Sequence, residues 1–322
     1  MRIIFFVFHS PLLSLPRMLP QDIQNKRILI SVLNWGMGHV SRSIGIIYQL
    51  IKQENTVIIA CDDSQKKIFS EYFPELQFIS HEGYPFQFDG KGNFRWDLTK
   101  RLSKLKTRLT EERKQVTSYV GQHNIDVVLS DHRYGFLSKD VPSVFITHQV
   151  NLPVKWYEKI VDSFHKRLMS SFRFIWVLDF DDSRLAGRLS QVDKNDKCIH
   201  IGPYSRFMLY DKVISKSATQ LLVASGPIIY AQLFVDNQLD KQSAVNLKVI
   251  APTDVVVPRE FERVANNWHS QDQAFLVAQK IISRPGYSTI MDAHFLECET
   301  EFYPTPGQEE QIYLNGLHKK KT

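Results

Sequence analysis

The feature that most constrains the fold is a strand, a glycine-containing loop, a helix and a second strand in succession near the N-terminus. Residues 26–33 contain a run of apolar and β-branched residues, interrupted after residue 27 by Ser31 alone, as is typical of a strand buried in a parallel sheet. The loop 34–42 contains Gly36 and Gly38, and apolar residues then recur at helical spacing before a second strand at 56–62. This β-α-β order predicts an α/β fold with a doubly wound parallel sheet.

Two later apolar segments, 125–130 and 142–147, have the same character, and polar residues follow each of them. In open α/β sheets, ligands bind at the carboxyl ends of the strands. We therefore expect one cleft to gather the polar side chains at these ends and in the glycine loop. They are His39, Asp131, His132, His148 and Gln149. For Asp131, a turn-forming aspartate after a strand is an equally good interpretation.

A second informative segment lies near the C-terminus. Residues 281–292 predict a short strand, a glycine turn and a helix that begins near Ser288 and Thr289. The N-terminus of a helix offers free N–H groups and a positive dipole, so it holds phosphate well. Asp292 stands one turn into this helix and is a candidate partner for ribose hydroxyls. Residues 304–311 form a Pro/Gly loop rich in Gln and Glu, which suits a neutral polyol. Together the two segments indicate a nucleotide sugar as ligand.

These two segments resemble the donor-binding half of nucleotide-sugar glycosyltransferases with two Rossmann-like domains, the GT-B type. In particular they resemble glycosyltransferase family 28, which includes the bacterial enzyme that adds N-acetylglucosamine to the lipid-linked wall precursor. The resemblance implies two doubly wound α/β domains facing a cleft. Many members have Glu where this chain has Asp292. The matching residues are Arg284, Gly286, Ser288, Thr289 and Asp292, then Pro304, Gly307, Gln308, Glu309, Gln311 and Asn315. A strand–turn–helix unit without a ligand is the alternative.

The resemblance also implies which backbone segments approach the donor phosphates. Gly36 and Gly38 match the Gly-x-Gly-His loop that follows the first strand in these enzymes and faces donor and acceptor. Ser225 and Gly226 follow another strand, where such enzymes place backbone N–H groups near the phosphates. All four residues are therefore candidate donor-binding positions.

Sugar transfer to a hydroxyl acceptor needs a base near the nucleophile and positive character near the leaving diphosphate. His39 is the candidate base, and Asp131 either orients it or serves as the base itself; a histidine that only hydrogen-bonds across the loop is the alternative. Arg284 and the helix start are expected to stabilise the diphosphate. No Asp-x-Asp sequence falls in a loop expected to hold the donor, so we invoke no metal and no other cofactor. By the resemblance, the transfer is inverting and a UDP-sugar is favoured.

Three other functions are compatible with parts of the sequence. Gly36-x-Gly38-x-x-Ser41, with Asp62 further on, approaches the dinucleotide fingerprint of dehydrogenases, but Ser41 replaces the third glycine and hinders close helix packing. A nucleotide-sugar epimerase would use the same two-domain scaffold. A non-catalytic binding protein is the third hypothesis, because the chain stops soon after the second donor segment, where family members continue with further helices.

The expected domain organisation follows from a Gly-Pro break at residues 202–203 and from this shortened C-terminus. Apolar runs at 248–252 and 274–278 are expected to be strands or strand–helix borders within the second domain. The boundaries are an N-terminal appendage at 1–22, an acceptor domain at 23–204, a linker at 205–217 and a donor domain at 218–322.

Composition agrees with a soluble globular protein, since 43% of the residues are hydrophobic and 23% are charged. The three cysteines, Cys61, Cys198 and Cys298, lie far apart, which indicates reduced thiols in a cytoplasmic protein and not a disulfide scaffold or a zinc site. The net charge of +6 is mild, and no nucleic-acid-binding signature accompanies it.

A basic stretch at 95–114 predicts an amphipathic helix with a leucine stripe at residues 98, 102, 105 and 109. Such helices are usually surface helices that pack by their apolar stripe. The alternative is a helix that makes peripheral contact with the inner face of an anionic membrane and approaches a lipid-linked acceptor.

Overall fold

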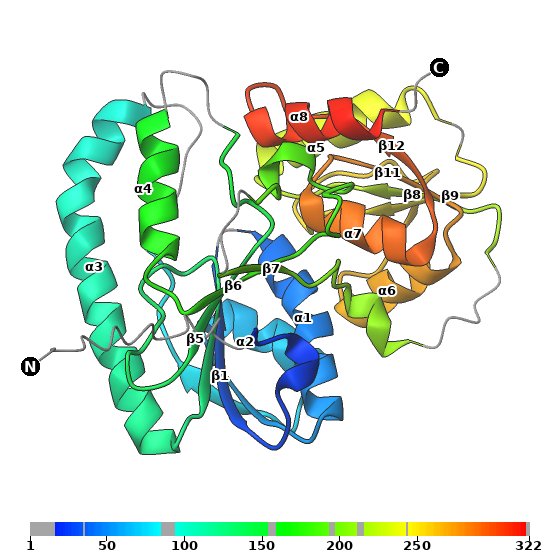
Figure 1. Cartoon of the computed structure of the whole chain (residues 1–322). Coiled ribbons are helices and arrows are strands. Elements are labelled where there is room, and N and C mark those ends of the chain that lie inside the picture. Colours follow the sequence, from blue (N-terminus) through cyan, green and yellow to red (C-terminus); the bar gives the residue numbers. More distant parts are fainter. Residues whose placement is uncertain are drawn as a thin grey trace, which may run out of the picture.

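The computed structural model describes residues 17–34, 36–84, 94–153, 159–192, 197–210, 216–242 and 244–319, with the side chains of 94–105 left out. The described chain forms two parallel sheets with helices packed on their faces (Figure 1). One sheet has seven strands in the order β3-β2-β1-β4-β5-β6-β7, and the other has five in the order β10-β9-β8-β11-β12. In each sheet the chain order reverses beside a central strand, which is the doubly wound topology. The prediction of two such α/β halves is confirmed.

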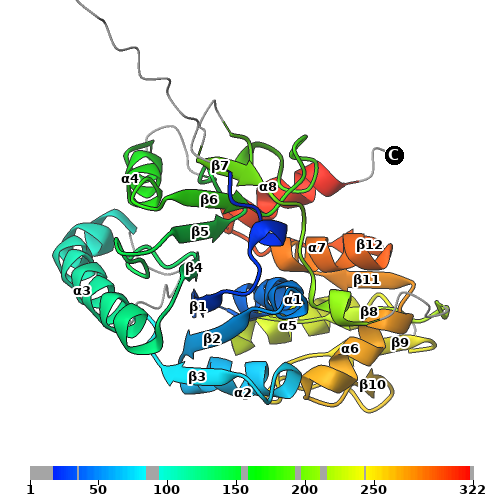
Figure 2. The same ribbon diagram turned by 60° about the horizontal axis from the view of Figure 1, so that its bottom comes forward.

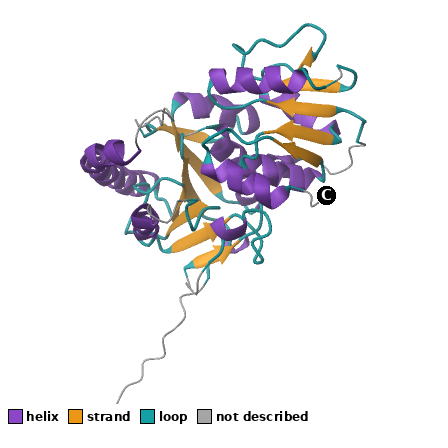
Figure 3. Cartoon of the chain, turned by 90° about the horizontal axis from the view of Figure 1, so that it is seen from above, coloured by secondary structure: helices purple, strands orange, loops and turns teal. Residues whose placement is uncertain are grey.

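The N-terminal half contains the seven-stranded sheet. Its strands are β1 (Arg27–Val32), β2 (Thr56–Cys61), β3 (Gln77–Ser80), β4 (Val127–Asp131), β5 (Ser143–Thr147), β6 (Phe174–Val177) and β7 (Cys198–His200), and its helices are α1 (Met37–Lys52), α2 (Asp63–Tyr72), α3 (Phe94–His123) and α4 (Lys159–Met169). The central strands are buried on both faces, because helices cover both sides of the sheet. Helices α3 and α4 lie on the face that points away from the five-stranded sheet (Figures 1 and 3).

The C-terminal half contains the five-stranded sheet. Its strands are β8 (Gln220–Val223), β9 (Leu247–Ile250), β10 (Glu262–Arg263), β11 (Lys280–Ser283) and β12 (Glu299–Phe302), and its helices are α5 (Ile228–Leu239), α6 (Trp268–Val277), α7 (Tyr287–Leu296) and α8 (Glu309–His318). The segment 274–278 ends α6, so its interpretation as a strand is wrong. A short buried apolar run does not by itself distinguish strand from helix, and here the Asn267 side chain caps the helix start at the N–H of Ser270.

The structure tests the predicted basic helix and the expected N-terminal appendage. The predicted basic helix is confirmed as α3, and of its leucine stripe the described side chain, Leu109, is buried. Part of the expected N-terminal appendage packs against the fold, since the indole N–H of Trp176 donates to the carbonyl of Met18 over 2.8 Å and Pro20 is buried. Among the described residues, no helix combines the length and apolar character needed to cross a membrane.

The segment that joins the two halves lies directly against α1. It contains the short 3₁₀ helix η4 (Arg206–Leu209), inside the expected linker. A Cβ atom at Gly45 in α1 would lie 2.4 Å from the carbonyl oxygen of Ser205, so only glycine allows the segment to pass this close. Helix α1 also packs against α7 and α2 against α6, so the two halves meet along helices (Figure 2).

A buried polar cluster around Arg206 fills this junction. The Arg206 Nε lies 2.5 Å from Asp272 Oδ1, and its Nη1 lies 2.5 Å from Asp292 Oδ2 and 2.7 Å from Ser41 Oγ. The hydroxyl of Tyr72 donates to the other oxygen of Asp272. The five side chains come from α1, α2, η4, α6 and α7. A buried charge is tolerable when it is paired and hydrogen-bonded, as here.

Candidate active site

The loop after β1 and the end of β4 place His39 beside Asp131. Strands β1 and β4 are neighbours, with Val32 in register with Asp131, so the loop that follows β1 begins next to that carboxylate. Gly36 has φ +84°, a conformation that favours glycine, and helix α1 starts immediately after it. This puts His39 in the first turn of α1, where its Nδ1 lies 2.9 Å from Asp131 Oδ1.

Arg42 lies one turn further along α1 and joins the same carboxylate. Its Nε donates to Asp131 Oδ2 over 2.7 Å and its Nη2 donates to Asp131 Oδ1, which makes a bidentate pair. The hydroxyl of Ser43 donates to the same Oδ2 over 3.2 Å. Arg42 Nη2 also lies 2.7 Å from His39 Nδ1. Asp131 and Arg42 are fully buried, whereas His39 keeps 16% of its side-chain surface exposed.

The charges at this cluster set the protonation states of the pair. Burial and the Arg42 guanidinium lower the pKa of His39, and the opposing attraction of Asp131 does not offset them. Burial alone would raise the pKa of Asp131, but Arg42 and His39 outweigh it and hold that pKa far below its usual range. At neutral pH the pair therefore consists of an ionised carboxylate and a neutral imidazole. A histidine that is to accept a proton must be in that neutral form.

His148, at the end of β5, connects this cluster to the C-terminal half. Its Nδ1 lies 2.9 Å from Arg42 Nη1, and its Nε2 lies 2.9 Å from Glu310 Oε1 in the first turn of α8. The ring of Tyr287, the first residue of α7, stacks on the His148 imidazole with centroids 4.2 Å apart and planes 5° apart. The candidate site is thus built from both halves of the molecule.

The remaining two residues of the expected cluster also lie here. His132 has φ +58°, is buried, and its Nε2 lies 2.6 Å from the Thr147 hydroxyl. Its ring centroid is 5.3 Å from that of His39, and burial holds its pKa well below the usual value. The side chain of Gln149 hydrogen-bonds to Glu310. The structure therefore brings His39, Asp131, His132, His148 and Gln149 together.

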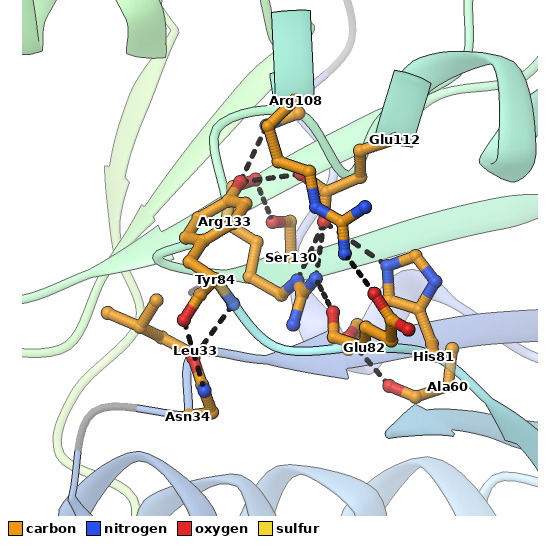
Figure 4. A network of polar contacts seen from close by, with 12 residues as sticks. Leu33, Asn34, Ala60, His81, Glu82, Tyr84, Arg108, Glu112, Ser130 and Arg133 are labelled. Carbon is orange, nitrogen blue, oxygen red and sulfur yellow. Dashed lines mark hydrogen bonds and ion pairs between the residues drawn. The ribbon is translucent and has the colours of Figure 1, made fainter. Parts of the chain in front are cut away.

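A second polar network holds the loops around the site in place (Figure 4). Arg133, directly after His132, donates its Nε to Glu112 of α3 over 2.7 Å and stacks over the Tyr84 ring at 4.9 Å. The Tyr84 hydroxyl donates to the other Glu112 oxygen over 2.5 Å. The side-chain oxygen of Asn34, in the loop after β1, accepts from the N–H of Tyr84 over 3.1 Å. These contacts fix the loops after β1, β3 and β4 relative to one another.

The glycine loop contacts the start of α7. The Ser288 hydroxyl donates to the carbonyl of Gly38 over 2.8 Å, and a Cβ at Gly38 would lie 2.8 Å from that hydroxyl oxygen. Gly286 precedes the first residue of α7, and Ser288 and Thr289 are half-buried in its first turn. The first-turn N–H groups of a helix have no acceptor within the helix. The expected phosphate-binding turn therefore lies against the loop that carries His39.

The other donor-binding candidates differ in solvent exposure and in the hydrogen bonds that they already make. Ser225 and Gly226 are exposed between β8 and α5, and Gly226 has φ +93°. Arg284 Nη2 donates to the carbonyl of Tyr230 over 2.8 Å, and its guanidinium lies 5.0 Å from the Phe234 ring centroid. Arg284 thus fastens the loop after β11 to α5, and burial lowers its pKa.

The Pro/Gly loop before α8 contains several exposed residues and one side chain that closes the loop. Gly307, with φ +80°, Gln308 and Glu309 are exposed. The side-chain oxygen of Gln311 accepts from the N–H of Thr305 over 2.8 Å, so this side chain closes the loop.

Asp292 occupies a different environment from the one expected for a ribose ligand. It is buried, with Oδ1 accepting from the Ser205 hydroxyl over 2.6 Å and Oδ2 accepting from Arg206. This face of α7 packs on α1 and η4, so the carboxylate points into the junction between the halves. This buried, paired position does not fit the ribose-binding role expected for Asp292.

Two side chains of this site were missed by the sequence interpretation. Arg42 stands three residues after His39 on the same helical face, which is the signal that could have found it. Glu310 lies within the second donor segment, but only the packing of the two halves brings it to His148.

Two motif-like sequences have structural uses instead. Residues 179–181 read Asp-x-Asp, but both oxygens of the buried Asp179 accept from neighbouring groups, the N–H of Ala186 and the Ser190 hydroxyl among them. Asp62, the acid of the dinucleotide fingerprint, caps α2 at the N–H of Gln65 over 2.9 Å. In the described part of the chain, no cluster of three or more His, Cys, Asp or Glu residues could hold a metal ion.

A cavity of about 530 Å³ lies away from this site. It sits near the C-terminal end of α7 and is lined by aromatic and polar residues such as Phe180, His294, Phe302 and His318. None of the candidate catalytic or donor-binding residues lines it.

Compared by sequence, the chain matches no protein family, and no curated protein is a significant relative. Compared by structure, it is similar to the glycotransferase of kitacinnamycin (TM-score 0.61, 17% identity, 91% of this chain and 85% of that one). It is also similar to the spinosyn rhamnosyltransferase SpnG complexed with thymidine diphosphate (TM-score 0.56, 13% identity, 90% and 84%). The chain has a GT-B-like fold.

The GT-B-like fold extends to proteins of another activity. The UDP-GlcNAc 2-epimerase from Neisseria meningitidis, bound to UDP-GlcNAc, is similar with a TM-score of 0.54, 12% identity and coverage of 89% of this chain and 85% of that one. At these identities the similarity establishes the fold, and function must be argued from the site.

Proposed function

We propose that this protein transfers a sugar from a nucleoside diphosphate sugar to a hydroxyl acceptor, with His39 as the general base. The observation that carries the proposal is the pairing of neutral His39 with ionised Asp131. Gly38, the residue before His39, accepts a hydrogen bond from Ser288 in the first turn of α7. A base and a candidate phosphate site are thus adjacent. Within the GT-B-like fold, we assign residues 23–204 to the acceptor half and 218–322 to the donor half.

The donor would bind mainly to the C-terminal half. The exposed backbone of Ser225 and Gly226 and the first turn of α7 offer N–H groups for the diphosphate. The exposed Gln308 and Glu309 offer hydrogen bonds to sugar hydroxyls. Proteins of similar fold are described as bound to thymidine diphosphate and to UDP-GlcNAc, which supports a nucleotide-sugar donor. We favour a UDP-sugar.

The proposed chemistry is a single displacement. In the proposed step, neutral His39 is the tautomer whose Nδ1–H donates to Asp131 Oδ1, so its Nε2 carries no hydrogen. His39 Nε2 takes the proton of the acceptor hydroxyl as its oxygen bonds to the anomeric carbon, and the bond from that carbon to the diphosphate oxygen breaks. Asp131 stabilises the imidazolium that forms. The positive end of α7 stabilises the negative charge on the leaving diphosphate. The stereochemistry inverts, in agreement with the family 28 motifs, and those motifs also suggest a lipid-linked acceptor.

A nucleotide-sugar epimerase is the second candidate. Asp131, His39, His148 and Glu310 form a dense group of titratable side chains, and an epimerase shares the fold. Epimerisation needs no acceptor, whereas transfer does. Incubating the protein with UDP-GlcNAc alone and analysing the sugar therefore separates the two: a changed sugar supports the epimerase and opposes our proposal.

The direct test is ligand binding followed by turnover. Thermal unfolding of the full chain is measured with UDP, dTDP, GDP, CDP, NAD and UDP-sugars. A ligand at about 100 times its dissociation constant stabilises the folded state by about 2.7 kcal/mol. A shift with one nucleoside diphosphate, followed by sugar transfer to a hydroxyl acceptor, supports the proposal. Stabilisation by NAD alone would favour a dehydrogenase, and donor binding without turnover would favour a binding protein.

A further inference from the structure

The hydrogen bonds of His148 fix its tautomer. Arg42 Nη1 is only a donor, so the His148 Nδ1 at 2.9 Å must accept and carries no hydrogen. Burial, the largest influence, lowers the pKa of His148, so the ring is neutral and its single hydrogen is on Nε2. That N–H then donates to Glu310 Oε1 over 2.9 Å. The direction of both hydrogen bonds is therefore determined.

Arg42 links His148 to Asp131, the partner of the proposed base His39. One edge of its guanidinium holds both oxygens of Asp131, and Nη1 holds His148. Asp131 Oδ1 in turn lies 2.9 Å from His39 Nδ1. The result is a continuous chain of hydrogen bonds, which we name the cross-half chain. Its members, in order, are Glu310, His148, Arg42, Asp131 and His39.

Burial and ring stacking hold the middle members of the cross-half chain in place. Arg42 and Asp131 are buried, and the parallel Tyr287 ring from α7 stacks on one face of the His148 ring. Glu310 is the one chain member from the C-terminal half, and it lies two residues after Gln308 in the segment proposed to bind the donor sugar. A change at the donor loop thus has a direct hydrogen-bonded route to the proposed base.

We propose that Glu310 and His148 are positioning residues, which act through Arg42 to hold His39 and Asp131 in the geometry needed for proton removal. This inference rests on the proposed function. It gives Glu310 a task that does not require contact with the substrate. It also means that the base is complete only when the α8 segment lies against β5, so proton removal depends on how the two halves are joined.

The charges around His39 predict the direction of the effect on its titration. Burial and Arg42 from α1 disfavour the protonated ring, whereas Asp131 favours it. His132 after β4 and His148 after β5 are the other titratable groups beside it, and both rings are neutral at neutral pH. Glu310 of α8 contacts His148 and compensates part of the Arg42 charge. Removing the Glu310 carboxylate therefore moves the pKa of His39 downward, and the acid limb of the pH–rate profile moves with it.

Two substitutions of Glu310 separate hydrogen bonding from charge. Glu310→Ala removes both, while the amide oxygen of Glu310→Gln can still accept from His148. We expect Glu310→Ala to lower kcat by roughly tenfold to a hundredfold, as for small displacements of a reacting group. Glu310→Gln should recover most of kcat but keep the downward shift of the His39 pKa. Glu299→Gln, an exposed carboxylate at the start of β12, is the control and should change neither.

The readouts are the kcat and KM of sugar transfer between pH 5 and 9, and ¹⁵N NMR titration of the histidines in the full chain. NMR should find His148 as the Nε2–H tautomer and a lower His39 pKa in both Glu310 variants. An Nδ1–H tautomer, or an unchanged His39 pKa in Glu310→Ala, overturns the inference even where kcat falls. If the wild-type protein transfers no sugar, the proposed function fails, and the NMR titration still decides the inference.

Discussion

Arg206 and Asp292 form a buried ion pair 2.5 Å long between the connecting segment and the helix of the candidate phosphate site. Asp292 was expected to bind ribose, yet its two oxygens hold Ser205 and Arg206. The Asp292 carboxylate, which the resemblance to family 28 assigns to the donor ribose, is here part of the junction between the two halves.

The first prediction concerns this ion pair. Asp292→Ala leaves the buried Arg206 guanidinium without one of its two carboxylates, which typically costs about 3–5 kcal/mol of folding free energy. Urea unfolding should report that loss, with Asp254→Ala, at an exposed position, as the matched control. A variant of normal stability that binds the donor weakly would instead restore the ribose role.

The second prediction concerns His39. Its replacement by alanine removes the proposed base but no donor contact, so kcat should fall by about 10²–10⁴ while donor affinity stays within a few fold. Steady-state kinetics and calorimetric titration of the nucleoside diphosphate measure the two quantities. Near-normal turnover would exclude His39 as the base.

The third prediction concerns stability at acid pH. His165 is buried between the Tyr134 hydroxyl and the carbonyl of Gln149, and burial lowers its pKa from 6.5 to about 4. The unfolded chain therefore binds this proton at a higher pH than the folded chain does. The stabilisation is fully present above pH 6.5 and is lost as the pH falls toward 4, at a cost of about 3 kcal/mol.

Urea midpoints at pH 7.5, 6 and 4.5 test this third prediction. In His165→Gln, which cannot ionise, the fall in stability over this range should be smaller. An equal fall in both proteins would assign the acid sensitivity to the other buried histidines.

The fourth prediction concerns the contact between Gly38 and Ser288. Gly38→Ala places a Cβ 2.8 Å from the Ser288 hydroxyl oxygen. Either this hydroxyl rotates away and loses its hydrogen bond to the Gly38 carbonyl, or α7 shifts away from the loop of His39. Gly38→Ala should therefore weaken donor binding. Ser288→Ala removes the clashing oxygen, and the double variant should bind the donor better than Gly38→Ala alone. Strictly additive losses, measured as a double-mutant cycle, would contradict the close approach.

Much of the candidate site was predictable because it depends on local order and topology. Apolar runs at 26–33 and 125–130 predicted strands of a parallel sheet, and the carboxyl ends of such strands share one edge. The structure makes these two strands neighbours. That rule alone brings Asp131 and His148 to the loop of His39.

The other contacts of the site could not be predicted, because they depend on which face of a helix is buried and on how the two halves pack. Asp292 and Ser288 lie four residues apart on the face of α7 that packs on α1, and only the packing decides that Asp292 pairs with Arg206 while Ser288 contacts Gly38. Glu310 reaches His148 across 162 positions of sequence, a contact that no local pattern encodes. The residues 274–278 were ambiguous for a local reason, since a short apolar run fits either a strand or a buried helix.

The junction around Arg206 also has a consequence for cooperativity. Among the residues that the structure describes, the carboxylates that pair with Arg206 are Asp272 and Asp292, both from the C-terminal half, while Ser41 and Tyr72 come from the N-terminal half. If either half unfolded alone, the other would expose to water this polar cluster, which is buried in the folded molecule, and the helix surfaces that flank Gly45. The two sheets are therefore energetically dependent on each other, and the molecule should lose its structure in one transition, not in two.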